Sequence, residues 1–330
     1  MNIPRVFLFD LDETIVFSEE MKSKAWTDIL KAFGFCWNEN EQVDGLKNVP
    51  DELRPKTGTS PHDFIGQLVD SLELLQKQVD LSEQNLSPNE IKYQQSLANL
   101  PDKDKRESMI RIMKDYWSQS LINEAILQAK KEEIKEVLGV SEAIRSLYGK
   151  GFRIGVTTQA PLEYAKVVLN YLGLIDKSDE RQDVVDVIVS GDMVERSKPD
   201  PESFVLAMEL IYIKTAIEER EEQLKRELLI KEKVDLGKSI YLQFFDENLI
   251  PGPEAVVGDS GSDIKAGKSY PGKNEILTVL INSRGLSVDE IKLIGPDIAI
   301  SNYRELPSRL EGRLSSSPER HKRKNSQEKK

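Results

Sequence analysis

A short apolar run that ends in two acids constrains this chain more than any other feature. Residues 6–9 are all apolar, and they are followed by Asp10 and, two positions later, by Asp12. Such a run is typical of a buried parallel strand, in which an acid is tolerated only at the end. Two acids this close repel each other, which favours a cation between them or a shared proton. We therefore expect a metal-assisted site at the carboxyl end of a parallel strand. The alternative is structural, with Asp12 capping a helix and Asp10 ending the strand in a turn.

Length and composition narrow both the architecture and the kind of metal. The 330 residues exceed what most single cores support, so we expect one domain with an inserted or appended second domain. The net charge of −11 argues against a nucleic-acid partner. One cysteine and two histidines exclude a disulfide framework and Cys-rich or His-rich metal sites. Any metal should therefore be a hard ion bound by oxygen, and Mg²⁺ is the expected cofactor.

The location of the protein is predicted from what the sequence lacks. It shows no basic and apolar regions of a signal peptide at its N-terminus. It also has no run of roughly 18 apolar residues, so no membrane partner is expected. We predict an intracellular, soluble and cytoplasmic protein. A Ser-rich and basic tail over residues 313–330, which we expect to be disordered, leaves a nuclear location open as the weaker alternative.

The apolar periodicity changes once along the chain. Residues 18–139 show helical spacing and no clear strand, which predicts a separate helical domain. Beyond residue 140 strands alternate with helices, and the predicted strands lie at 153–158, 184–189, 255–258, 276–281 and 297–300. This alternation indicates an α/β fold, a Rossmann-like parallel sheet with helices on both faces. The first strand belongs to that sheet, so the all-helical domain is an insertion after it.

The predicted α/β domain comprises residues 1–17 and 140–312. It includes a charged helical insertion at about 213–253, which breaks the regular spacing of strands and helices. Residues 213–238 within it are dense in Glu, Lys and Arg, and a long solvated helix is the simplest interpretation. A helix that binds a partner protein is the alternative.

Polar residues from distant parts of the chain follow the predicted strands. Thr158 follows the second strand, Lys198 lies in a Lys-Pro-Asp-Pro sequence after the third, and Asp259 and Asp263 follow the fourth. Taken alone, each has an ordinary structural interpretation as a turn residue, a surface lysine or a helix cap. Together with the acids of the first strand, they would converge on one sheet edge. Carboxylates, an ammonium and a hydroxyl there would balance a hard cation and a dianionic phosphate.

These motifs, in this order, resemble those of the haloacid dehalogenase superfamily. The similarity is to the branch with a helical cap after the first strand, which includes enzymes like phosphoglycolate phosphatase and beta-phosphoglucomutase. The matching residues are Asp10-Leu11-Asp12-Glu13-Thr14, Thr158, Lys198-Pro199 and Gly258-Asp259 to Asp263. The helical domain is matched by position and helicity only. The resemblance implies that residues 1–17 and 140–312 form the catalytic core and residues 18–139 form the cap.

The resemblance also implies a two-step phosphoryl transfer. Asp10 would attack phosphorus and become an aspartyl-phosphate. Asp12 would donate a proton to the leaving oxygen and then accept one from the water that hydrolyses the intermediate. Such chemistry needs positioning and charge neutralisation more than elaborate covalent steps.

The remaining matched residues would bind the metal and the phosphate. The resemblance implies that Mg²⁺ is bound by Asp10, the backbone carbonyl of Asp12 and Asp259, with Asp263 as a ligand or a support. Thr158 would bind the transferring group. Lys198 would offset the negative charge and orient Asp10.

Two positions discriminate between activities within the superfamily. Asp12 favours a leaving group that needs a proton, whereas the dehalogenases and phosphonate-cleaving members lack an acid there. Aligned on Ala25-Trp26, Lys22 stands where similar sugar phosphomutases have a histidine. This difference disfavours a mutase and leaves Lys22 as a candidate substrate contact. Glu13 also departs from the small glycine that is common at its position.

We therefore predict a Mg²⁺-dependent phosphatase acting on a small phosphorylated metabolite. A sugar-phosphate phosphomutase is the first alternative. A binding or regulatory protein that uses the cap and residues 213–238 is the second. The residues indicate neither the substrate nor the oligomeric state.

Overall fold

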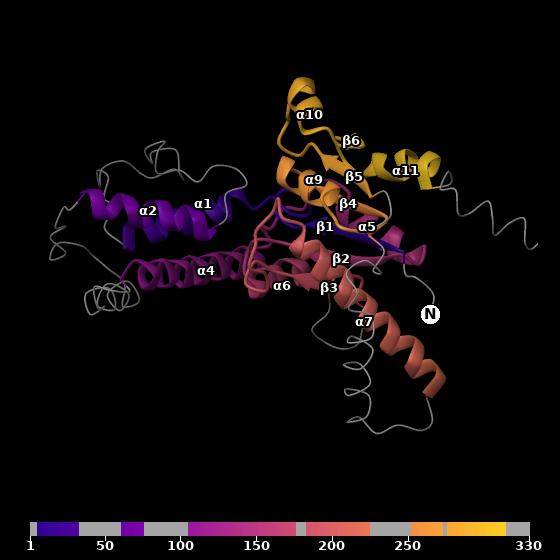
Figure 1. Cartoon of the computed structure of the whole chain (residues 1–330), viewed down its shortest axis with the longest axis horizontal. Helices are drawn as coiled ribbons and strands as arrows, with labels where there is room; N and C mark the ends of the chain where they lie inside the picture. Colours follow the sequence, from indigo (N-terminus) through magenta and orange to yellow (C-terminus); the bar gives the residue numbers. More distant parts are fainter. Residues whose placement is uncertain are drawn as a thin grey trace, which may run out of the picture.

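The chain forms a six-stranded parallel sheet with helices on both faces (Figure 1). The computed structural model describes residues 5–32, 61–75, 105–175, 183–224, 252–272 and 276–314. The strands are β1 (Val6–Asp10), β2 (Arg153–Thr157), β3 (Val187–Val189), β4 (Ala255–Gly258), β5 (Leu277–Ile281) and β6 (Ile298–Ile300). Their order is β3-β2-β1-β4-β5-β6, so the first strand lies at the centre. The predicted Rossmann-like α/β fold is confirmed.

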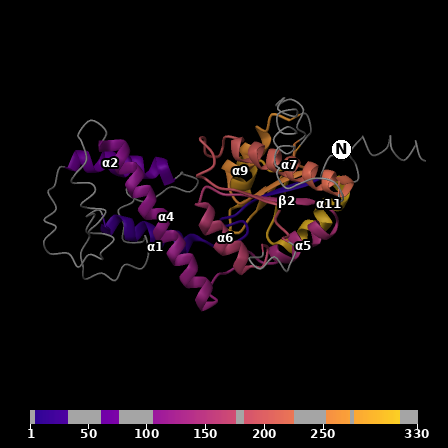
Figure 2. The same ribbon diagram turned by 90° about the horizontal axis from the view of Figure 1, so that it is seen from below.

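Alternating side chains of the central strand anchor a different helical layer on each face. Leu8 packs in the cluster that contains Phe204 of α7 (Glu202–Leu224) and Ala266 of α9 (Gly261–Lys268). Phe7 and Phe9 point the other way, since neighbouring strand residues alternate between faces. They pack in the cluster formed with α5 (Val140–Gly149), α6 (Leu162–Tyr171), the 3₁₀ helix η5 (Tyr303–Glu305) and α11 (Leu306–Leu314). Figure 2 shows α7 and α9 on one side of the sheet, with α5, α6 and α11 on the other.

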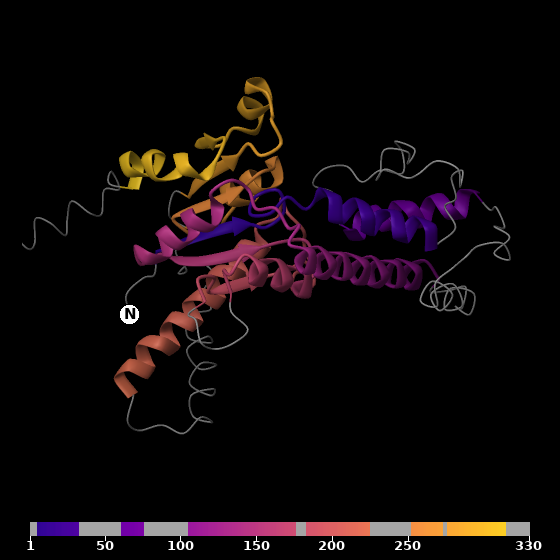
Figure 3. The same ribbon diagram turned by 180° about the vertical axis from the view of Figure 1, so that it is seen from behind.

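Of the described helices between β1 and β2, all except α5 lie beside the sheet. They are α1 (Glu19–Ala32), α2 (Pro61–Leu75) and α4 (Lys105–Lys131), and they follow the first strand, where the helical insertion is predicted. Their shared core contains Trp26, whose ring meets Phe64 edge-on at 4.6 Å and stacks on Trp117 at 5.1 Å between centroids. Figure 3 shows this group of helices extending away from the sheet. The division at residues 18 and 139 stays a prediction.

The chain enters and leaves this helical group through two segments that lie side by side. Val16 forms an antiparallel bridge with Glu136. On either side of that bridge, the Phe17 amide donates to Lys135 O and the Val137 amide donates to Ile15 O, both at 2.9 Å. The segments that lead into and out of the helical group are therefore joined by one short ladder of backbone hydrogen bonds.

The strand and helix bounds differ from the predicted ones mainly at the third strand. β3 begins at Val187, and not at residue 184, because the amides of Val184 and Val185 donate to Leu174 O (3.0 and 3.1 Å). Of the predicted charged insertion, residues 213–224 continue α7, while 225–251 lie outside the described residues. The predicted tail lies outside them beyond Leu314. Within the described ranges, no helix combines the length and the apolar character needed to cross a membrane.

One further helix, α10 (Val288–Ile294), stands at the β6 edge of the sheet (Figure 1). A capping box joins Ser287 and Glu290 at its start, and Gly295 in the left-handed region (φ 68°) ends it. Residues 282–284 follow the carboxyl end of β5, where Ser283 contacts Glu13 in the turn after β1 and Arg284 contacts Asp259 after β4.

Candidate active site

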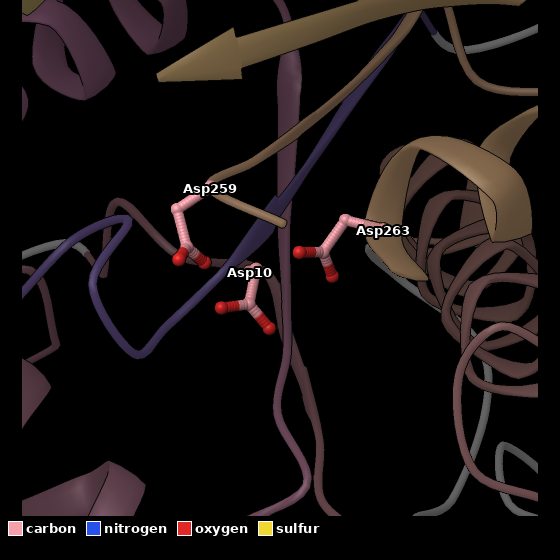
Figure 4. A group of neighbouring side chains, drawn as sticks. All are labelled: Asp10, Asp259 and Asp263. Atoms are coloured by element: carbon pink, nitrogen blue, oxygen red, sulfur yellow. The ribbon is translucent and has the colours of Figure 1, made fainter. Parts of the chain in front are cut away.

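Three carboxylates meet at the carboxyl edge of the central strands (Figure 4). Asp10 ends β1, Asp259 follows β4 directly, and Asp263 lies in the first turn of α9. β1 and β4 are neighbours in the sheet, so their ends lie together. One oxygen from each of the three carboxylates lies within 4.8 Å of the other two, and all three residues are buried.

The turn between β4 and α9 brings two of these acids together. A Cβ on Gly258 would lie 2.3 Å from Asp263 Cβ, so only glycine permits this approach. Ser260 caps α9 by accepting from the Asp263 amide, and the Asp263 carboxylate accepts from the Ser260 amide at 3.2 Å. The capping interpretation of this turn is therefore right for Asp263. It does not compete with a site role, because the other carboxylate oxygen faces the cluster.

Lys198 supplies a buried positive charge to the cluster. Its Nζ lies 2.6 Å from Asp10 Oδ1 and 2.9 Å from Asp263 Oδ1, and it also donates to Thr157 O at 3.3 Å. Burial alone would lower the pKa of Lys198, but these two carboxylates raise it overall. The ammonium therefore remains charged at any physiological pH.

The positive charges near the three carboxylates do not fully offset the cost of ionising them. Burial raises the pKa of Asp10 well above its usual range, and Lys198 opposes this while the neighbouring carboxylates add to it. Burial likewise raises the pKa of Asp259 to about 7, with a further contribution from Asp263 and an opposing one from Arg284. Carboxyls with raised pKa values retain protons where a cation would otherwise stabilise their charge.

The residues present fit a divalent cation. Lys198 and Arg284, whose Nε lies 2.5 Å from Asp259 Oδ2, leave one net negative charge when the three carboxylates are ionised. Asp259 Oδ2 and Asp263 Oδ1 are buried, and each forms an ion pair with one of these two cations. Oxygen ligands in an anionic pocket are what Mg²⁺ prefers. Asp10, Asp259 and Asp263 could therefore hold it.

Asp12 has a separate environment. Its Oδ2 accepts from Thr158 Oγ1 at 2.9 Å and lies 3.1 Å from Lys22 Nζ, which comes from α1. Its Oδ1 accepts from the Tyr164 hydroxyl at 3.1 Å. Burial would raise the pKa of Asp12, but Lys22 and the hydrogen bonds from hydroxyl groups lower it overall. Asp12 is therefore ionised at neutral pH.

Glu13 has a structural role that explains its departure from glycine. Its backbone lies in the left-handed region at φ 59°, where glycine is usually favoured. Its carboxylate accepts from the amides of Ser18 (2.7 Å) and Glu19 (3.0 Å), so it satisfies the start of α1. Ser283 donates to the Glu13 carbonyl at 2.6 Å and ties this turn to the end of β5. The position of α1 over the sheet edge thus depends on a residue next to the site.

The structure brings the predicted residues to one sheet edge, but it divides them into two groups. One group surrounds the acid cluster and contains Asp10, Lys198, Asp259 and Asp263. The other surrounds Asp12 and contains Lys22 and Thr158, so Thr158 contacts the second acid and not the first. The roles assigned to these residues in catalysis and in metal or phosphate binding stay predictions.

Two residues of the site were missed by sequence reasoning. Arg284 follows β5 closely, so the strand-end rule that identified the acids could have found it. Tyr164 had no such signal, because an aromatic residue in the first turn of an amphipathic helix is usually a core residue. Only the structure shows that the Tyr164 hydroxyl contacts Asp12.

The chain is similar to known hydrolases in both sequence and structure. The sequence model of the haloacid dehalogenase-like hydrolases matches residues 4–218. No curated protein matches the chain in sequence. A hydrolase from Pseudomonas syringae is similar in structure, with 17% identity, a TM-score of 0.53, and coverage of 94% of this chain and 99% of that one. At this identity the similarity shows the fold.

Two other solved structures are similar over nearly their whole length. CbbY from Rhodobacter sphaeroides, in complex with phosphate, has 18% identity and a TM-score of 0.48, with 92% of this chain and 96% of that one covered. A predicted phosphoglycolate phosphatase from Haemophilus somnus 129pt has 17% identity and a TM-score of 0.48, with 93% and 98% covered.

Proposed function

We propose that this chain, which belongs to the haloacid dehalogenase-like hydrolase family, is a phosphatase that acts on a small phosphorylated metabolite. The observation that carries this proposal is the pair of differently placed acids at the end of β1. Asp10 is 2.6 Å from a buried ammonium and lies among carboxylates that fit a cation. Asp12 is held by hydroxyl groups and a second ammonium. Two acids in such different surroundings suit two different roles.

Asp10 suits the role of nucleophile. Lys198 fixes its Oδ1 and offsets its charge, which leaves the second oxygen to attack phosphorus. The bond from this oxygen to phosphorus forms as the bond from phosphorus to the leaving oxygen breaks, giving an aspartyl-phosphate. Mg²⁺ bound by Asp10, Asp259 and Asp263 would supply positive charge for the phosphoryl oxygens.

Asp12 suits the role of proton carrier. The low pKa of Asp12 makes it a carboxylate in the free protein, as needed for a base that accepts a proton from water in the second step. An incoming phosphate dianion would repel this carboxylate and raise its pKa. Asp12 could then take up a proton with the substrate and pass it to the leaving oxygen in the first step.

Lys22 is the candidate contact of the cap with the substrate. It lies on α1, and its side chain is 31% exposed although its ammonium contacts the buried Asp12. The side chain of Lys22 therefore extends from the proton carrier to solvent. Closure of the helices over a bound substrate would bring further side chains to it and exclude water.

The proposal is tested with purified full-length protein and a panel of phosphorylated metabolites, together with p-nitrophenyl phosphate. We expect release of inorganic phosphate that requires Mg²⁺ and is lost in Asp10→Asn. Asp289→Asn, the same substitution at an exposed position of α10, is the control and should leave the rate unchanged. Turnover that survives in Asp10→Asn would overturn the assigned nucleophile, and a panel without any phosphate release would overturn the function.

The same panel separates the two alternatives predicted from the sequence. A sugar-phosphate mutase would convert one sugar phosphate into an isomer while releasing phosphate only slowly. A binding protein would show neither reaction. Isomer analysis of the reaction mixtures by NMR distinguishes all three outcomes.

A further inference from the structure

The hydroxyl of Tyr164 contacts the candidate proton carrier from the interior of the protein. It donates to Asp12 Oδ1 at 3.1 Å, and the whole side chain is buried. A buried tyrosine hydroxyl needs a hydrogen-bond partner, and this one meets a carboxylate, where such bonds are strong. Tyr164 lies in the first turn of α6, directly after the strand end that carries Thr158.

The two oxygens of Asp12 are consequently not equivalent. Oδ1 is turned to the buried Tyr164. Oδ2 is turned to Thr158, at 2.9 Å, and to the partly exposed Lys22, at 3.1 Å. The contact with the partly exposed residue therefore lies at Oδ2, and rotation of the carboxylate would break the bond that Oδ1 accepts from Tyr164.

We propose that Tyr164 is a positioning residue for proton transfer, which holds Oδ1 of Asp12 so that Oδ2 faces the leaving oxygen of the substrate. This inference rests on the proposed phosphatase function. In the step concerned, the bond from phosphorus to the leaving oxygen breaks and its electron pair stays on that oxygen. The proton moves from Asp12 Oδ2 to the same oxygen, while Asp10 forms its bond to phosphorus. Tyr164 keeps its own proton throughout.

This role predicts a dependence on the leaving group. An alkyl phosphate releases a strongly basic alkoxide, which needs the proton during bond breaking. p-Nitrophenyl phosphate releases a weakly basic phenoxide, which can leave without it. Loss of the Tyr164 hydroxyl should therefore slow alkyl substrates and spare the aryl substrate. A general loss of structure or of metal binding would slow both alike.

The test compares kcat/KM of wild type and Tyr164→Phe, because kcat/KM reports the steps up to release of the leaving group. The substrates are p-nitrophenyl phosphate and the alkyl phosphate that wild type turns over fastest. We expect a fall of about tenfold or more for the alkyl phosphate, as for other lost hydrogen bonds to charged groups, and less than about twofold for the aryl phosphate. Because Phe retains the packed ring, this variant should fold.

Tyr303→Phe is the matched control. Tyr303 is also fully buried near the site, but its hydroxyl donates to the backbone carbonyl of Thr14 at 3.0 Å and not to Asp12. Any effect of Tyr303→Phe should be equal for the two substrates. Substituting Tyr164→4-fluorophenylalanine fills the volume of the hydroxyl without its proton and should reproduce the selective loss.

The outcomes separate this inference from the proposed function. Equal slowing of both substrates in Tyr164→Phe, or no slowing of either, would overturn the role of Tyr164 while wild-type turnover upheld the phosphatase. Absence of turnover in wild type would overturn both. Selective loss with the alkyl phosphate, absent in Tyr303→Phe, is the result expected from the geometry.

Discussion

Lys198 Nζ lies 2.6 Å from Oδ1 of Asp10, a residue 188 positions away in the sequence, and both side chains are buried. The lysine precedes α7, and the aspartate ends the central strand. This ion pair therefore connects the helical layer on one face of the sheet to the middle of the site. The ammonium therefore neutralises buried charge in the fold, and its position supports the proposed chemistry.

Lys198→Met should cost both stability and activity. Removing the ammonium leaves two buried carboxylates without their counter-ion, which we expect to lower the free energy of unfolding by about 3 kcal/mol. It should also raise the pKa of Asp10 further, so that the nucleophile is protonated, and reduce kcat by about 10²-fold or more. Denaturant unfolding and phosphate release measure the two effects.

Lys166→Met is the matched control for this substitution. Lys166 forms an exposed pair with Glu163 at 2.7 Å, on the surface of α6. We expect its loss to change stability by no more than about 0.5 kcal/mol, because exposed pairs are screened by solvent. A Lys198→Met protein as stable and active as Lys166→Met would contradict the importance given to the buried pair.

Magnesium should stabilise the protein increasingly as the pH rises from 5 to 8. Burial raises the pKa of Asp259 from the ordinary 3.8 to about 7, so the folded metal-free protein binds a proton that the unfolded chain releases. Asp259 therefore contributes stability below pH 3.8 that is lost as the pH rises through about 7. Mg²⁺ replaces that proton. The difference in melting temperature between Mg²⁺ and EDTA should grow over this range.

Asp259→Asn provides the control for this pH dependence. The amide has no charge to lose, so the metal-free variant should be more stable than wild type at pH 8. The increase in melting temperature on adding Mg²⁺ should largely disappear at every pH. A Mg²⁺ effect in wild type that is constant with pH would show that protons and the metal do not compete for this carboxylate.

Arg284→Gln should tighten the binding of divalent cations. The guanidinium Nε lies 2.5 Å from Asp259 Oδ2, so it competes for an oxygen that the metal would use. Removing one positive charge at this distance should strengthen binding by about tenfold. Titration calorimetry with Mg²⁺, or electron paramagnetic resonance with Mn²⁺, measures the change without any turnover. Arg309→Gln makes the same charge change on the exposed surface of α11 and should leave the affinity for Mg²⁺ unchanged. Weaker binding in Arg284→Gln would show that Arg284 does not compete with the metal for Asp259.

Lys22→Ala should destabilise the protein at neutral pH but not in acid. Burial opposes ionisation of Asp12, and Lys22 is the largest contribution that lowers its pKa. An acid whose pKa is lowered by folding contributes stability above its ordinary value of 3.8, which is lost as the pH falls below it. We expect Lys22→Ala to lower the free energy of unfolding by about 1 kcal/mol at pH 7.

Lys24→Ala, on the same helix, is the control, since Lys24 forms an exposed pair with Asp28. Thermal melts of both variants from pH 7 towards pH 3 should show the difference from wild type shrinking for Lys22→Ala. A difference that stays the same across this range would mean that Lys22 acts through packing and not through Asp12.

The sheet and the acids at its edge could be predicted from the sequence because both depend on local patterns. The residues at the end of a buried parallel strand are fixed by a local pattern, and parallel strands place those ends together. Asp10 and Asp259 were found in this way, and Lys198 was found from its Lys-Pro-Asp-Pro sequence after the third strand. The strand pattern predicts that an acid lies at a strand end. It does not predict which cation or hydroxyl group contacts the carboxylate.

Contacts that depend on side-chain direction could not be predicted. The contact of the Thr158 hydroxyl with Asp12 was not predicted, while its role in binding the transferring phosphate stays a prediction. Tyr164 reaches the same carboxylate only because α6 starts immediately after β2 and packs against the sheet. The angle between a helix and a strand decides such contacts, and it depends on the packing of the whole layer.

The short ladder that joins Val16 to Glu136 has a consequence for how this protein could be altered. Because the two connecting segments lie side by side, the chain from Phe17 to Lys135 leaves the sheet and returns to it at one point. Exchanging this segment would leave the backbone path of the strands unchanged, but it would replace the contacts that α4 makes with α6 and that Lys22 of α1 makes with Asp12. Transplanting the helical group from a relative of known specificity would therefore test whether this group determines the substrate, while the acids of the sheet edge are retained.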